Sequence, residues 1–152
     1  MSRRGLFVIL PIFLRSFFDA PARVAVAVLW FTGATLATTA AILAATRPGA
    51  GPYGAFVVAA VGLIVLGGGL LAVNVWAMAV SFVLLAGQLA SVIGTIWQLV
   101  FGIDAGKAAE LRALGFEPAI GVAINLAFSL LATCVFALAL FRRAHRARDD
   151  LR

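Results

Sequence analysis

The longest stretch without a charged side chain, residues 48–103, constrains the fold more than any other feature. As one helix it would measure about 80 Å at 1.5 Å per residue, whereas the hydrocarbon core of a bilayer is about 30 Å thick. A stretch of this length must therefore fold back on itself inside a membrane. The glycine run at 67–69 would leave the first arm too short to cross. We therefore predict a turn at Asn74, between spans over about 54–73 and 76–101.

Two more uncharged segments, at about 24–46 and 119–141, flank this hairpin, and each is long enough to cross the bilayer as a helix. In the whole chain of 152 residues, 64% are hydrophobic and 12% are charged. Soluble domains have about 45–50% apolar and about 25% charged residues. We therefore expect an all-α fold, a four-transmembrane-helix bundle, in which residues 1–152 form a single integral membrane domain.

The longest predicted loop, at 102–117, carries the signals of a short helix. Asp104 can cap its start, and Gly115 can end it after Leu114. Pro118 then favours the first turn of the last span.

The first 23 residues admit two interpretations. One is a secretory signal peptide, with an apolar run at 5–14 and a small-residue cleavage site that ends at Ala22. The other is an uncleaved amphipathic helix at about 5–18 that lies in the membrane interface. We favour the interfacial helix, because cleavage would leave both ends of the mature chain outside. Its polar stripe would carry Arg4, Arg15 and Asp19, and its apolar stripe Leu6, Ile9, Phe13 and Phe17.

Basic residues outside the spans indicate one orientation. The tail at 142–152 holds five arginines and should be cytoplasmic, and an even number of spans places the N-terminus there too. The Ala-, Gly- and Arg-rich composition is typical of GC-rich bacterial genomes, so we expect a multi-pass protein of the bacterial inner membrane. We expect contact with anionic lipid head groups through Arg3, Arg4, Arg15, Arg142, Arg143 and Arg146.

Polar and small side chains form stripes inside the last two spans. The third span carries Ser81, Gln88, Ser91, Thr95 and Gln98 on one stripe, with Gly87 and Gly94 beside it. The fourth carries Gly121, Asn125, Ser129 and Thr133, each four residues apart. Such stripes indicate close packing and hydrogen bonds between helices. A polar path between these spans, or an interface with a partner, would have the same pattern.

The chain has few residues that could support catalysis, proton transfer or metal binding. No ionisable residue lies inside the four spans, which argues against proton-coupled transport. His145 and Cys134 are the only histidine and the only cysteine. We expect Cys134 to be a small buried apolar residue, at a different depth from His145. The sequence therefore predicts no metal site, no cofactor and no catalytic pair, and it lacks an aromatic and basic platform for nucleic acid.

The sequence thus predicts a non-enzymatic protein that works by packing. It would be an accessory or structural subunit of a membrane complex, or a homo-oligomer. The alternative is a channel or transporter for a small neutral or anionic solute, with a polar path between spans three and four.

Overall fold

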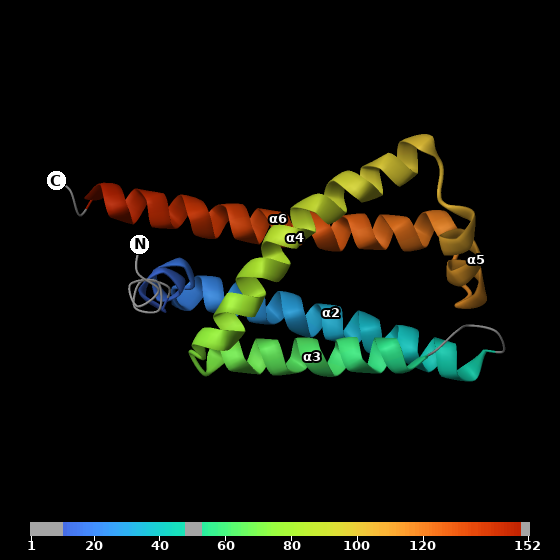
Figure 1. The fold of residues 1–152 in the computed structure, drawn as a ribbon, viewed down its shortest axis with the longest axis horizontal. Coiled ribbons are helices and arrows are strands. Elements are labelled where there is room, and N and C mark those ends of the chain that lie inside the picture. The colour runs from blue at the N-terminus through green and yellow to red at the C-terminus, as the bar shows by residue number, and fades with distance from the viewer. Residues whose placement is uncertain (1–10, 48–52, 150–152) are drawn as a thin grey trace, which may run out of the picture.

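The computed structural model describes residues 11–47 and 53–149, and these residues form an all-helical fold without strands, as the sequence predicts. Six helices are present in this part of the chain. They are a short helix at 11–17, α2 (Ala20–Thr46), α3 (Tyr53–Leu71), α4 (Val75–Phe101), α5 (Ala105–Ala113) and α6 (Pro118–Asp149) (Figure 1).

Four of these helices are long and apolar enough to cross a membrane: α2, α3, α4 and the Pro118–Arg146 part of α6. This finding confirms the prediction of a multi-pass membrane protein. We expected the basic residues at 142–152 to form a tail separate from the last span. Instead, α6 continues as one helix to Asp149.

The start of α2 lies earlier than the sequence analysis placed it. The side chain of Asp19 accepts a hydrogen bond from the Ala22 N–H at 3.0 Å and caps the helix, which begins at Ala20 rather than near Val24. Pro21 lies in the first turn, where its missing N–H would have no helical partner in any case. Pro21 therefore starts the first span, and Asp19 belongs to its cap.

The chain turns between α3 and α4 at Asn74, the position that the sequence indicated. The Asn74 side chain accepts hydrogen bonds from the N–H groups of Trp76 at 2.9 Å and Ala77 at 3.3 Å, so it caps α4. This short connection does not make α3 and α4 close neighbours along their lengths. α3 packs mainly against α2, while α4 leaves the turn at a steep angle and packs mainly against α6 (Figure 1).

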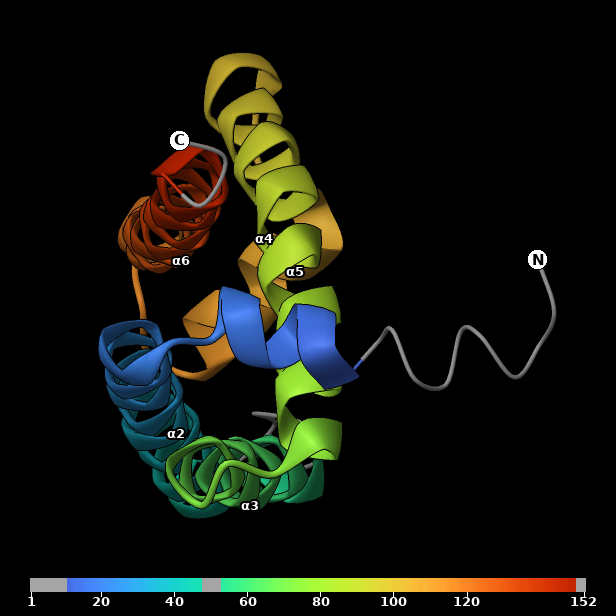
Figure 2. The ribbon, with the colours of Figure 1, turned by 90° about the vertical axis from the view of Figure 1, so that its left-hand side faces the viewer.

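In Figure 2 the four long helices surround the centre of the molecule, and the helix at 11–17 lies across the end that faces the viewer. Leu14, Phe17 and Phe18 are at most 1% exposed. The Phe17 ring centroid lies 5.1 Å from that of Phe82 in α4 and 5.5 Å from that of Phe136 in α6. One face of this helix is therefore buried against the protein. Residues 5–10 of the interfacial helix that we expected lie outside the described residues.

Two contacts join this N-terminal segment to the end of α6. Arg146 Nη2 lies 2.7 Å from Asp19 Oδ2, and the Arg143 guanidinium lies 3.9 Å from the centre of the Phe13 ring. Both ends of the described chain therefore lie at the same end of the molecule, as an even number of spans requires.

The ends of α3 and α5 share one capping geometry but use different residues. Each closes with the paired backbone hydrogen bonds of a Schellman motif. The left-handed residue is Gly115 with φ 81° after α5, but Val73 with φ 58° after α3. A left-handed β-branched residue is strained, whereas glycine adopts this conformation freely.

Replacing Val73 with glycine should therefore raise the free energy of unfolding in detergent by about 0.5–1 kcal/mol. This is the left-handed strain of about 1–2 kcal/mol less the extra chain entropy of glycine. Gly115→Ala is the matched opposite change and should lower stability, because the Arg47 guanidinium also occupies the place of the new Cβ. A loss of stability in Val73→Gly would show that the valine side chain contributes more through packing than its backbone strain removes.

Candidate functional site

Polar side chains of α4 and α6 meet in a ladder along the contact between these helices. Asn125 Nδ2 donates to Thr95 Oγ1 at 2.9 Å. One turn further, Ser129 Oγ donates to Gln88 Oε1 at 2.9 Å and lies 3.1 Å from Ser91 Oγ. Ser129 and Thr95 are at most 2% exposed. The structure therefore brings five of the residues singled out in the sequence into one hydrogen-bonded contact.

Two other residues from the same stripes lie at the edge of this ladder. Gln98 Oε1 is buried and has no hydrogen-bond partner among the described residues. Gly121 packs against α5, since a Cβ on Gly121 would lie 2.6 Å from Leu111 Cδ2. Gly121 therefore allows the close approach of α5 to α6.

A further buried hydrogen bond joins α2 to α4. Trp30 Nε1 donates to Ser81 Oγ at 2.9 Å, and both side chains are at most 1% exposed. The sequence placed Ser81 on the polar stripe but gave Trp30 no partner. A buried indole N–H usually has an acceptor, so a tryptophan in the middle of a span was a signal that could have been used.

The outward face of α4 carries a regular stripe that the sequence analysis missed. The positions are alternately four and three residues apart, which is the spacing of the seam of a left-handed coiled coil. All are exposed, and a Cβ on Gly87 or Gly94 would meet no atom within 4 Å. We call this stripe the α4 seam; it consists of Trp76, Val80, Val83, Gly87, Ala90, Gly94, Trp97 and Phe101.

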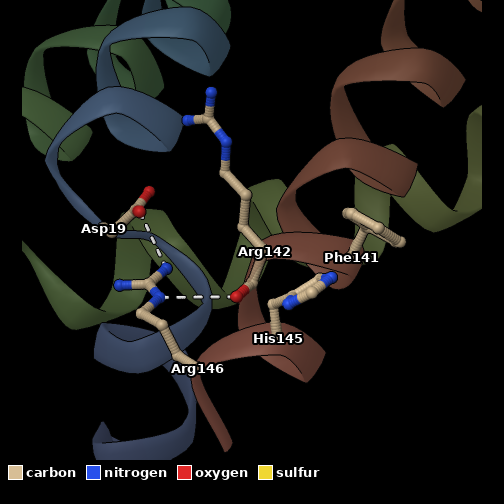
Figure 3. Close-up of a pocket in the computed structure, with 5 residues that line it drawn as sticks. All are labelled: Asp19, Phe141, Arg142, His145 and Arg146. Atoms are coloured by element: carbon tan, nitrogen blue, oxygen red, sulfur yellow. Dashed lines mark hydrogen bonds and ion pairs between the residues drawn. The ribbon is translucent and has the colours of Figure 1, made fainter. Parts of the chain in front are cut away.

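The basic end of the molecule contains an open cavity of about 410 Å³, lined by Asp19, Phe141, Arg142, His145 and Arg146 (Figure 3). Arg146 bridges it, because Nη2 is bonded to Asp19 Oδ2 and Nε donates to the Arg142 carbonyl oxygen at 3.5 Å. The His145 ring lies edge-on to Phe141, with centroids 5.0 Å apart. One arginine of this end is thus already paired with a carboxylate.

The arginines that we expected at lipid head groups differ in their surroundings. Arg15, Arg142 and Arg146 are exposed, whereas Arg143 is half-buried over Phe13. Arg3 and Arg4 lie outside the described residues.

The expectation that Cys134 is buried is wrong, because its side chain is exposed. It lies five positions after Ser129, which turns it to a different side of α6 from the ladder. In the part of the chain that the structure describes, no three His, Cys, Asp or Glu residues are grouped so that they could hold a metal ion.

Comparison with protein-family models, with curated proteins and with solved structures gives no match. The function is therefore argued from the contacts and surfaces of the chain alone.

Removing the Ser129 hydroxyl should test the α4–α6 ladder. Ser129→Ala should lower the free energy of unfolding in detergent by about 1 kcal/mol, within the range of about 0.6–2 kcal/mol for a hydrogen bond between membrane helices. Ser16→Ala is a matched control, because the exposed Ser16 hydroxyl bonds only to the Phe13 carbonyl within its own helix. Equal stability of the two variants would mean that the ladder adds nothing to helix association.

Proposed function

We propose that this protein acts without catalysis, by packing the α4 seam against another membrane-embedded helix. It would be a subunit of a membrane complex or, most simply, a homo-oligomer. The exposed small residues of the seam carry this proposal. Lipid tails are as apolar as leucine, so membrane helices associate through close packing rather than through the hydrophobic effect. Gly87, Ala90 and Gly94 leave the middle of the seam flat, and Trp76 and Trp97 stand toward its ends.

A second copy of the chain fits this seam by symmetry. Copies in one membrane share one orientation, so a two-fold axis along the membrane normal would pair α4 with α4 in parallel. Such an interface uses the same patch on both copies. The glycines of one seam would then face the glycines of the other, and the two backbones could approach closely.

The polar ladder supports packing over the alternative of a solute path between spans three and four. Gln88, Thr95 and Asn125 are the side chains that would line such a path. Each makes a hydrogen bond across the α4–α6 contact. Buried polar groups with satisfied hydrogen bonds hold two helices together and fix their register.

Self-association can be measured by energy transfer between labelled copies in liposomes. Gly87→Leu and Gly94→Leu should each weaken it by roughly tenfold or more, the equivalent of about 1.4 kcal/mol, because a large side chain separates the helices. Leucine is a better helix former than glycine, so this loss would not reflect a weaker α4. Gly68→Leu in α3 is the control, because Gly68 is also open to the outside but lies off the seam.

A cross-link gives an independent reading of the same interface. In a Cys134→Ser background, Ala90→Cys should form a disulfide-linked dimer, and Ala59→Cys on the exposed side of α3 should not. Unchanged energy transfer in both leucine variants, together with no cross-link at position 90, would exclude the α4 seam as a self-interface.

We also propose that both termini are cytoplasmic, in a bacterial inner membrane, and that the basic end lies on anionic head groups. The exposed Arg15, Arg142 and Arg146 lie at the end of the molecule that holds both ends of the described chain, which supports this orientation. A C-terminal alkaline phosphatase fusion, which is active only outside the cytoplasm, should therefore be inactive. The same reporter inserted at 48–52 should be active, and the reverse result would invert the topology.

A further inference from the structure

A cavity of about 490 Å³ lies between the α2–α3 pair on one side and α5 and α6 on the other. Its lining follows α2 from Gly33 to Ala40 and α6 from Gly121 to Phe128. Each of these stretches is about 10 Å long at 1.5 Å per residue. Gly33 lies in the middle of α2, so the cavity extends from the middle of the spans to the end that carries α5.

The inner end of this cavity is closed by packed side chains. A Cβ on Gly33 would lie 3.1 Å from both Leu63 Cδ1 and Phe128 Cζ, so little space remains at that depth. At the other end, Leu114 and Phe116 contribute to the lining. Leu114 is buried there against Ala44, whereas Leu36 of α2 and Ile124 of α6 in the lining are exposed. The cavity is therefore a slot that is closed toward mid-membrane and opens sideways, between α2 and α6, to the surrounding lipid.

The walls of the slot are suited to a hydrocarbon chain. Two polar side chains in the lining, Thr39 and Asn125, donate hydrogen bonds within the protein, to the Thr35 carbonyl oxygen and to Thr95 Oγ1, both at 2.9 Å. The other walls are aliphatic and aromatic side chains, glycine and alanine. A length of about 10 Å fits within one leaflet, which is half of a hydrocarbon core about 30 Å thick. Acyl chains of the surrounding lipid have this chemistry and lie at this depth.

A cation lies beside the α5 end of the slot. The Arg47 guanidinium lies against Gly115, in the place where a Cβ would stand, and Gly115 directly follows Leu114 of the lining. Arg47 is also exposed. Guanidinium groups bind phosphate oxygens with paired hydrogen bonds, so an anionic head group would find its counter-charge next to the slot.

We propose that this slot binds one acyl chain of an anionic phospholipid, with the lipid phosphate held by Arg47. The site is separate from the α4 seam, because its walls come from α2, α3, α5, α6 and Phe116. The bound lipid would fill the space between the α2–α3 pair and α6, in the leaflet on the same side of the membrane as α5.

Native mass spectrometry of the full chain in mild detergent, titrated with phosphatidylglycerol, tests this proposal. The parent protein should retain one lipid per chain. Ala37→Phe and Thr39→Phe place a ring in the slot from α2 and should each weaken binding by roughly tenfold, the equivalent of losing about two buried methylene groups. Ala59→Phe is the control for added bulk on an exposed membrane helix and should bind like the parent.

The head group is tested by a second comparison. Arg47→Gln should bind phosphatidylglycerol several-fold more weakly but leave the binding of uncharged diacylglycerol unchanged. Equal binding of the two lipids by the parent protein would overturn the role of Arg47. Full phosphatidylglycerol binding by both phenylalanine variants would overturn the slot itself. Arg47→Gln adds no bulk, so it keeps the proposal open to refutation even where a phenylalanine variant fails to fold.

Discussion

Hydrocarbon offers no hydrogen-bond partners, and this constraint decides which helices of the molecule pair with one another. Backbone groups are satisfied within each helix, so only the polar side chains are left to find partners. In α2 the threonine hydroxyls donate to carbonyl oxygens of their own helix, as Thr32 does to Val28 and Thr35 to Phe31. α2 therefore needs no polar neighbour there and packs on α3 through small residues, such as Gly67 under the Phe31 ring.

The amides and hydroxyls of α4 behave differently, because they reach beyond their own helix. Gln88 and Thr95 accept from side chains of α6, and Ser81 accepts from Trp30 of α2. These bonds explain why α4 leaves α3 after the turn at Asn74. A short connection brings together the ends of two helices, but the partner along the rest of the helix is the one that supplies donors and acceptors.

The same reasoning separates what the sequence predicted from what it could not. Turns and helix ends depend on local chemistry, so the turn at Asn74, the cap at Asp104 and the stop at Gly115 could be read directly. The start of α2 was harder to predict, because Pro21 lies in its first turn, where a proline does not interrupt a helix. The polar side chains of α4 lie where the sequence analysis expected helix contacts. The exposed α4 seam could not be read, because a lipid-facing surface of small apolar residues has the same composition as a packed one.

At the basic end, a count of arginines from the sequence also fails to show which of them are free to contact lipid. It treats every arginine beside a span as available to lipid, but Arg146 is paired with Asp19 and Arg143 lies over Phe13. The Phe13 contact joins the helix at 11–17 to α6, and the Asp19 ion pair joins the start of α2 to α6. Part of the basic charge therefore has a structural role in closing this end of the molecule. Arg15 and Arg142, by contrast, are exposed and have no carboxylate partner among the described residues.

The α4 seam and the lipid slot lie on different helices, and this arrangement lets both operate in one assembly. A partner that covers Gly87 and Gly94 would contact α4, whereas the slot is lined from α2, α3, α5 and α6. An assembly built on α4 would therefore leave the slot open to the bilayer. The α2–α3 pair and the α4–α6 pair contact each other less than the two helices within each pair do. A lipid chain seated between them would add packing where the protein itself supplies least of it.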